Sequence, residues 1–255
     1  MLIKACLNGS RAPGAHPALP LTPEQLAGAA RLAVDAGAGA LHVHPRRADG
    51  TQSLEGTDIA AALVAIRAAC PGIPVGISTG IWIEPDVERR RLLVATWDEL
   101  PDFAGVNFSE PGALDLCAAL LARGIGVEAG LWTPADAQLL IESNLVDCCL
   151  RLLIEPMDGV PEAALETVQG IERHLDGAGV QTPRLLHGTG GTAWPMLELA
   201  LRRGYDTRIG FEDTLTLPDG RQAQDNAELV ATAWEYARRI ARMGERRMND
   251  APAHE

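Results

Sequence analysis

The sequence predicts a single-domain α/β protein with the closed (β/α)8 architecture of a TIM barrel, and three observations support this fold. Eight short apolar runs alternate strictly with eight segments of helical character. Parallel strands joined by helices pair through right-handed crossovers, and eight such units in 255 residues match the usual size of one barrel. No Pro- or Ser-rich linker divides the chain. The alternative is a doubly wound open sheet, but no GxGxxG motif follows the first apolar run.

The strands are expected at the apolar runs, whose lengths suit buried parallel strands. In chain order they are LIKACLN (2–8), ALHVHP (40–45), PVGIST (74–79), FAGVNF (103–108), IGVEAGL (125–131), DCCLRLLIE (147–155), PRLLHG (183–188) and TRIGF (207–211).

The helices are expected at 22–37, 57–70, 85–100, 111–124, 133–144, 161–179, 192–204 and 225–243. The first shows its boundaries most clearly, because Thr22 suits the N-cap, Pro23 the first helical position and Gly37 the end. The barrel domain is therefore expected to span 1–242, followed by a charged, frayed tail at 243–255.

Composition excludes several classes of protein. Apolar residues make up 47% of the chain and charged residues 22%, which is typical of a globular domain. A net charge of -12 argues against nucleic acid or an anionic membrane as the main partner. The five cysteines form no CxxC pair, so reduced, buried thiols are expected, with Cys148 and Cys149 on opposite faces of a strand. The chain shows neither a signal peptide nor a membrane span, and we expect a cytoplasmic protein.

Polar side chains follow nearly every predicted strand. In a (β/α)8 barrel the loops at the carboxyl ends of the strands carry the active site, so these residues are candidates for function. They are Asn8-Gly9, His42 and His44, Ser78-Thr79-Gly80, Asn107 and Glu110, Glu128, Glu155, His187-Gly188, and Glu212-Asp213.

His42 and His44 predict a metal site. Alternate residues of a strand share a face, so both imidazoles point the same way. An isolated HxH is more often a hydrogen-bonded pair, but the polar strand ends around it favour metal binding. A catalytic site needs about three protein ligands, and Glu212 or Glu128 is the candidate for the third. Such a set suits Zn(II), while Mn(II) and Fe(II) remain alternatives.

The last strand carries a second charged group. Positions 208, 210 and 212 share a face, so Arg208 and Glu212 are expected to point inward and Asp213 to lie at the rim. An inward arginine needs an anion, either a carboxylate partner or the substrate.

The loop LLHGTGGTAWP contains Gly188, Gly190 and Gly191 just before a predicted helix. Exposed amides beside a helix N-terminus bind anions, and this loop of a barrel often holds phosphate. The alternative is that the glycines only allow the helix to dock.

Together these motifs resemble the β-keto acid cleavage enzyme family, the family of the 3-keto-5-aminohexanoate cleavage enzyme. The resemblance runs nearly end to end and rests on ACLNG, LTPEQLA, LHVHPR, STG, LLHGTGGTAWP, TRIGFEDTLTLPDG and DNAELV. It implies a zinc-dependent (β/α)8 enzyme, typically a homotetramer. Such enzymes react a β-keto acid with acetyl-CoA to give acetoacetate and a new acyl-CoA.

The resemblance also implies roles for individual residues. The zinc ligands fall on His42, His44 and Glu212, and the Arg–Asp pair that activates the substrate falls on Arg208 and Asp213. Substrate contacts fall on Ser78 and Thr79 of the third strand, on Asn107 and on Glu128, and the loop with Gly188, Gly190 and Gly191 is expected to hold a CoA phosphate.

The chain departs from the family pattern in three ways. Many members carry an acidic residue where this chain has Arg11, and often Arg-Asp where it has Arg46-Arg47; the chain is also short for the family. If an added arginine reaches the barrel mouth, anionic or neutral β-keto acids are favoured over cationic ones.

Two other functions are compatible with a metal in a barrel. A zinc hydrolase would attack a small ester or amide with metal-bound hydroxide, but the chain offers no further histidine set on its middle strands. A non-enzymatic ligand-binding barrel would hold a structural metal, which is usually closed by four protein ligands.

Overall fold

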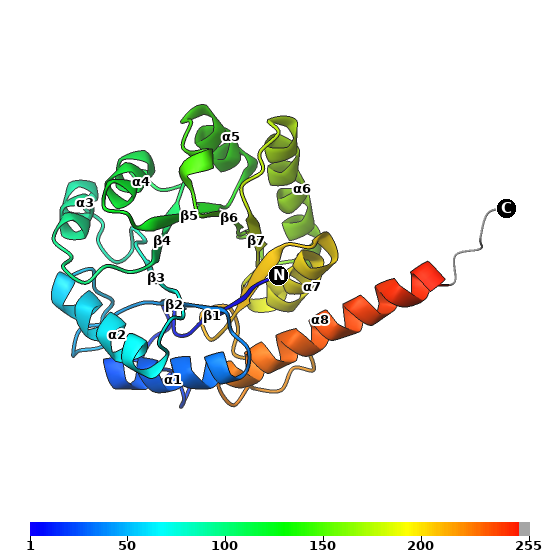
Figure 1. The fold of residues 1–255 in the computed structure, drawn as a ribbon, viewed down its shortest axis with the longest axis horizontal. Coiled ribbons are helices and arrows are strands. Elements are labelled where there is room, and N and C mark those ends of the chain that lie inside the picture. The colour runs from blue at the N-terminus through cyan, green and yellow to red at the C-terminus, as the bar shows by residue number, and fades with distance from the viewer. Residues whose placement is uncertain (250–255) are drawn as a thin grey trace.

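The computed structural model describes the backbone of residues 1–249 and the side chains of residues 1–242. Its eight parallel strands form a closed barrel in sequential order, β1 to β8, and the helices form a ring around it (Figure 1). The predicted single-domain (β/α)8 fold is confirmed. Within the described residues, no helix combines the length and apolar composition that a membrane span requires.

The elements follow the predicted alternation. The strands are β1 Ile3–Cys6, β2 Ala40–Val43, β3 Val75–Ser78, β4 Phe103–Asn107, β5 Gly126–Leu131, β6 Arg151–Ile154, β7 Arg184–Leu186 and β8 Asp206–Ile209. The helices are α1 Pro23–Asp35, α2 Gly56–Ala69, α3 Val87–Ala95, α4 Ala113–Ala122, α5 Pro134–Glu142, α6 Pro161–Gly177, α7 Ala193–Arg203 and α8 Asn226–Asn249.

Capping residues define where helices α1 and α5 begin. The Thr22 side chain accepts from the Gln25 amide, the Gln25 side chain accepts from the Thr22 amide, and Pro23 begins α1. This capping box satisfies amides that otherwise lack partners at a helix start. A second capping box, formed by Thr133 and Asp136, begins α5.

The predicted sixth strand begins too early. Val146–Cys148 forms a short 3-10 helix, and β6 starts only at Arg151, where its pairing with Glu128 of β5 begins. Of the residues before Arg151, Leu150 still donates its amide to the Val127 carbonyl of β5 at 2.8 Å, whereas Val146–Cys148 forms the helical turn. Cys148 is consequently exposed and not on a strand, while all five cysteines are free thiols.

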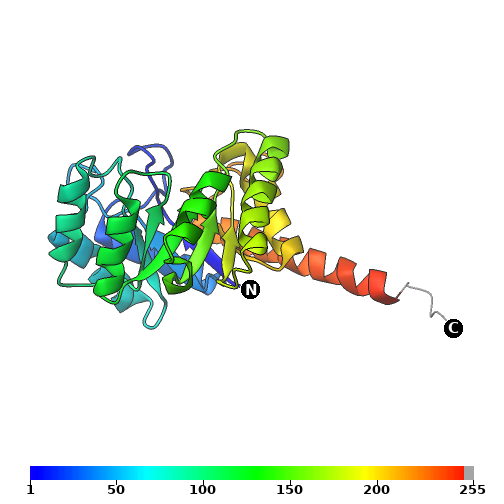
Figure 2. The same cartoon turned by 90° about the horizontal axis from the view of Figure 1, so that it is seen from above.

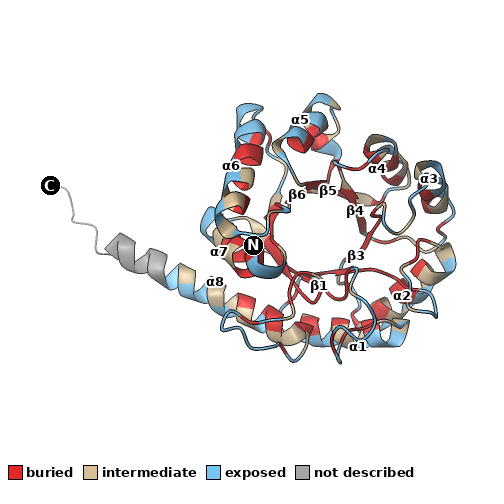
Figure 3. Cartoon of the chain, turned by 180° about the vertical axis from the view of Figure 1, so that it is seen from behind, coloured by how far each residue is buried: buried red, intermediate tan, exposed pale blue. Residues whose placement is uncertain are grey.

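The core lies between the barrel and its helices. The strands are buried almost throughout, while the helices bury one face and expose the other (Figure 3). Helix α8 continues to Asn249 and extends well past the barrel (Figures 1 and 2). Its backbone thus stays helical into the segment expected to be a frayed tail. Residues 250–255 of that predicted tail lie outside the described part of the chain.

Candidate metal centre and active site

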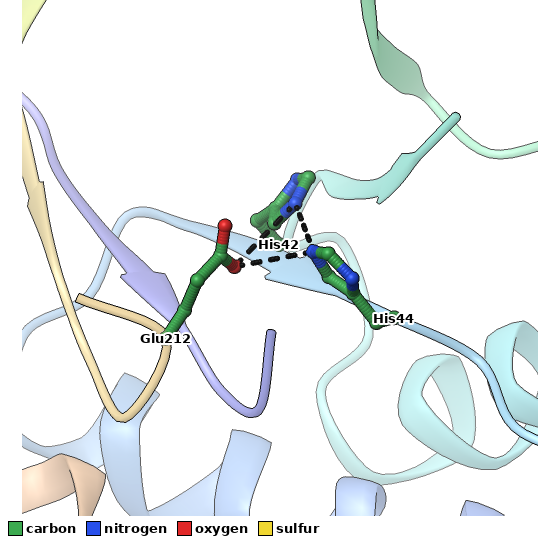
Figure 4. Close-up of side chains that lie close together, drawn as sticks. All are labelled: His42, His44 and Glu212. Atoms are coloured by element: carbon green, nitrogen blue, oxygen red, sulfur yellow. Dashed lines mark hydrogen bonds and ion pairs between the residues drawn. The ribbon is translucent and has the colours of Figure 1, made fainter. Parts of the chain in front are cut away.

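His42, His44 and Glu212 converge at the carboxyl end of the barrel (Figure 4). The Nε2 atoms of the two histidines lie 3.2 Å apart, and Glu212 Oε2 lies 3.6 Å from the first and 3.4 Å from the second. Tetrahedral zinc holds ligands at about 2.0–2.1 Å, which places neighbouring ligand atoms about 3.3 Å apart. The three atoms therefore have the spacing of one face of a zinc coordination shell.

Neighbouring groups orient the three side chains. His44 Nδ1 lies 2.5 Å from Gln52 Oε1, an acceptor, so Nδ1 carries the proton and the Nε2 lone pair is available for a metal. The Asn8 side chain binds both the amide and the carbonyl of His44, at 2.9 Å each. Glu212 Oε1 accepts from Arg208 at 2.9 Å, whereas its buried Oε2 has no hydrogen-bond partner among the described residues. A metal ion would satisfy this oxygen.

The electrostatics of the cluster suit a metal. Burial lowers the pKa of His42 well below its usual value and outweighs the attraction of Glu212, so the imidazole stays neutral. Burial raises the pKa of Glu212, but the positive charge of Arg208 and the two histidines outweigh it and hold that pKa well below the usual value. A neutral imidazole and an ionised carboxylate are the ligand states that divalent transition metals bind.

Arg208 and Asp213 form a buried ion pair. Arg208 donates from Nη2 at 2.7 Å and from Nε at 3.2 Å, both to Asp213 Oδ1. The prediction that Asp213 lies at the rim is wrong, since it is fully buried. The chain turns after β8, with the amides of Asp213 and Thr214 donating to the Gly210 carbonyl, and this turn directs Asp213 inward. Burial lowers the pKa of Arg208, but Asp213 and the further neighbours Cys6, Glu212 and Glu155 together outweigh burial, and the pKa is raised well above its usual value.

His187 and Glu155 extend this charged network. His187 is 1% exposed, and its Nδ1 lies 3.5 Å from Asp213 Oδ1 while its Nε2 lies 3.6 Å from Glu155 Oε2. Burial and Arg208 lower the pKa of His187, but the two carboxylates outweigh them and the pKa is raised. Both residues follow predicted strands, but the sequence alone indicates no role for them. Only their shared contacts with the Arg208–Asp213 pair show that they belong to the site.

A cavity of about 330 Å³ opens beside the metal cluster, Arg208 and Glu155. It is lined by Ser10, His42, His44, Ser78, Trp82, Gly105, Asn107, Trp132, Leu153, Glu155, Met157, Thr189, Arg208 and Glu212. The metal cluster, Arg208 and two predicted substrate contacts, Ser78 and Asn107, therefore share one cavity.

Two predicted substrate contacts lie elsewhere. Thr79 does not line this cavity, and its hydroxyl donates to the Gly105 carbonyl at 2.6 Å. Glu128 is fully buried inside the barrel, where it forms ion pairs with Lys4 and with Arg151, the latter at 3.4 Å. Strand β5 continues to Leu131, so Glu128 lies below the carboxyl end of the strand. The alternative that Glu128 is the third metal ligand is wrong, because Glu212 completes the cluster.

The glycine loop after β7 supports the turn after β8 that carries Glu212 and Asp213. The Gly190 amide donates to the Asp213 carbonyl at 2.7 Å, with Gly190 in a left-handed conformation at φ 56°. A Cβ on Gly188 would lie 2.6 Å from Thr192 Oγ1, so this position requires glycine. Thr189 lines the cavity, whereas Gly188, Gly190 and Gly191 do not. Phosphate binding at this loop stays a prediction.

The cavity is not lined by Arg11 or Arg47, which depart from the pattern of the family that the sequence resembles, or by Arg46. Arg46 is buried and donates to the carbonyls of Gly9, Arg11 and Gly50. Arg11 donates to the carbonyls of Phe211 and Glu212, and Arg47 lies 3.7 Å from Glu55. Arg11 and Arg46 thus hold loops together, and the contacts of Arg46 and Arg47 do not support the prediction that one of these two reaches an anion at the barrel mouth.

Comparison with known proteins places these features in a family. The 3-keto-5-aminohexanoate cleavage enzyme of Fusobacterium nucleatum is 27% identical, over 95% of this chain and 93% of its own length. The 3-oxoadipate:acetyl-CoA acetyltransferase of Cupriavidus necator is 28% identical, over 91% of this chain and 87% of its own length. Among solved structures, the type I 3-dehydroquinate dehydratase of Clostridium difficile shares the fold, with a TM-score of 0.61 and 11% identity over 94% of this chain and 93% of that one.

The family model described as beta-keto acid cleavage enzyme matches residues 1–247, which include every residue of the cluster and the cavity. The chain therefore belongs to the β-keto acid cleavage enzyme family.

Proposed function

We propose that this acyltransferase is zinc-dependent and reacts a β-keto acid with acetyl-CoA, giving acetoacetate and a new acyl-CoA. The observation that carries the proposal is the cavity in which His42, His44 and Glu212 lie beside the Arg208–Asp213 pair. The names of two relatives, a cleavage enzyme for a keto acid and an acetyl-CoA acetyltransferase, support the same chemistry.

The metal would be held by the two Nε2 atoms and by Glu212 Oε2. When bound, zinc supplies a Lewis acid that polarises a carbonyl oxygen and makes the neighbouring α-hydrogen more acidic. Three protein ligands leave a coordination position open, which a structural site with four protein ligands would not. This distinction favours an enzyme over a ligand-binding barrel with a structural metal.

Asp213 is the proposed base. Arg208, which lines the cavity, occupies Oδ1 of the buried Asp213, while Oδ2 has no hydrogen-bond partner among the described residues and is the oxygen left free to take up a proton. Arg208 compensates the charge of the carboxylate and fixes its orientation through two N–H groups. The Ser78 hydroxyl and the Asn107 amide, which line the cavity, are the proposed further substrate contacts.

The remaining steps transfer an acyl group. The α-carbon of the keto acid, after losing its proton to Asp213, bonds to the acetyl carbonyl of acetyl-CoA, and the CoA thiolate leaves. The thiolate then attacks the original keto carbonyl, and the bond between that carbonyl and the α-carbon breaks. The α-carbon recovers the proton from Asp213. The products are acetoacetate and an acyl-CoA that carries the substituent of the keto acid.

Isotope labelling tests this reaction. With acetyl-CoA that carries carbon-13 in its acetyl group, we expect labelled acetoacetate and an unlabelled new acyl-CoA in equal amounts by mass spectrometry. A zinc hydrolase would release free CoA or an acid without any new acyl-CoA. Elemental analysis of the purified protein tests the metal, with one zinc per chain expected.

We also propose a homo-oligomer, a tetramer by analogy with the family, in the cytoplasm. Helix α8 projects beyond the barrel, and this projection supports assembly (Figure 1). Light scattering coupled to size-exclusion chromatography measures the number of chains. The reduced state of the five cysteines is consistent with the proposed compartment.

A further inference from the structure

One side of the active-site cavity is apolar. We infer that this side selects β-keto acids whose substituent is an uncharged, apolar chain, an inference that rests on the proposed function. The apolar side of the cavity consists of Trp132, Leu153 and Met157, and we call it the β5–β6 wall. Trp132 directly follows β5, Leu153 lies on β6, and Met157 follows β6.

The wall lies across the barrel from the metal cluster. His42 and His44 come from β2 and its carboxyl end, and Glu212 from the turn after β8, so the cluster lies at the β8–β1–β2 side. In the closed order β1 to β8, strands β5 and β6 lie opposite β1 and β2. A substrate whose keto acid end lies at the cluster therefore has this wall available for its other end, within the same cavity of about 330 Å³.

The charged groups in the cavity already have partners. Arg208 donates to Asp213 and to Glu212. Glu155 Oε2 accepts from Trp132 Nε1 at 3.2 Å and faces His187, so the one acidic group beside the wall is engaged. Among the described residues that line the cavity, Arg208 is the only arginine or lysine, and it is already paired. A terminal carboxylate of a substrate would therefore find no free cationic side chain here.

These contacts disfavour charged substituents. A terminal ammonium or carboxylate would lose its water shell against Trp132, Leu153 and Met157 without gaining a partner, which is unfavourable. An apolar chain gains from the same contact in proportion to its buried area. Leu153 is 4% exposed and Met157 56%, so the wall extends from the interior of the cavity to solvent. The flexible Met157 side chain can adapt to chains of different length.

The first experiment compares three substrates on the holoenzyme with saturating acetyl-CoA. They are 3-oxohexanoate with an apolar end, 3-oxoadipate with a terminal carboxylate and 5-amino-3-oxohexanoate with an ammonium group. We expect kcat/KM to be at least about tenfold higher for 3-oxohexanoate than for either charged acid, a discrimination that apolar pockets commonly reach.

The second experiment changes the wall. Met157→Lys should raise the ratio of kcat/KM for 3-oxoadipate over 3-oxohexanoate by about tenfold or more, because the new cation gives the carboxylate a partner. Val160→Lys is the matched control, since Val160 is similarly exposed at 55%, lies in the same β6–α6 connection and does not line the cavity. This control should leave the ratio at its wild-type value.

The outcomes separate the inference from the proposed function. Preference of the wild type for either charged acid overturns the inference while the acyl transfer itself stands. An effect of Met157→Lys on the KM for acetyl-CoA alone would assign the wall to CoA and also overturn it. If none of the three acids yields a new acyl-CoA, the proposed function is wrong and the inference falls with it.

Discussion

Arg208 places two of its N–H groups on one carboxylate oxygen of Asp213, Oδ1, and leaves the buried Oδ2 without a hydrogen-bond partner among the described residues. A third contact, from Arg208 Nη2 to Glu212 Oε1 at 2.9 Å, ties the same guanidinium to a proposed metal ligand. Arg208 thus fixes the orientation of two carboxylates at once, those of the proposed base and of a proposed metal ligand.

Replacing Arg208 by lysine should leave the fold and the bound metal in place and lower turnover by about 10²-fold or more, because lysine cannot reproduce the planar, two-pronged contact. The loss should appear in proton abstraction, measured by NMR as slower exchange of the substrate α-hydrogens in deuterated water. Wild-type exchange and acyl transfer in this variant would overturn the role of Arg208.

Asp213→Asn should stop α-hydrogen exchange, because an amide at this buried position cannot accept the proton. We expect turnover to fall by about 10²–10⁴-fold while the zinc content stays at one per chain. The asparagine side chain is nearly the same size as that of aspartate, so the variant should fold, and circular dichroism checks this. Undiminished exchange would show that another group is the base.

His42→Ala should remove both bound zinc and activity while the barrel remains folded, since two ligands hold the metal much more weakly than three. Elemental analysis after dialysis gives the metal content. His174→Ala is the control, because His174 is exposed on α6, far along the chain from the cluster. A full equivalent of tightly bound metal in His42→Ala would contradict the ligand assignment.

His187 should make stability depend on pH. Its pKa in the folded protein is raised by Glu155 and Asp213 against the opposing effects of burial and Arg208. The unfolded chain has the ordinary value of about 6.5, so the folded state binds the proton more tightly. The stabilisation is fully present below about pH 6.5 and is lost as pH rises through the folded pKa.

Urea unfolding of wild type and His187→Gln between pH 6 and 9 checks this sign. The difference in the free energy of unfolding between the two proteins should shrink as pH rises, by at most about 1.4 kcal/mol per pH unit. Titration of the His187 ring carbon by NMR gives the pKa directly. A difference that is constant across this range, or that grows with pH, would contradict the raised pKa.

Part of this protein could be predicted from the sequence, because local patterns determine local structure. The alternation of apolar runs with capped helical segments, such as the one beginning at Thr22 and Pro23, indicated the barrel and its order of elements. The two-residue period of a strand placed His42 and His44 on one face, and their imidazoles indeed point to the same cluster.

The tertiary structure decided what depends on distant partners. It brought Glu212 rather than Glu128 to the histidines, because strand length and register set the level of Glu128 in the barrel, beside Arg151. It turned Asp213 inward, since the chain bends at Gly210 after β8, and the strand period does not extend through a turn. It also directed Arg11 and Arg46 to backbone carbonyls of neighbouring loops. Residue type and spacing determine which face of a strand or helix a side chain occupies. The residue that this side chain contacts depends on segments that are distant in the sequence and come together only in the folded chain.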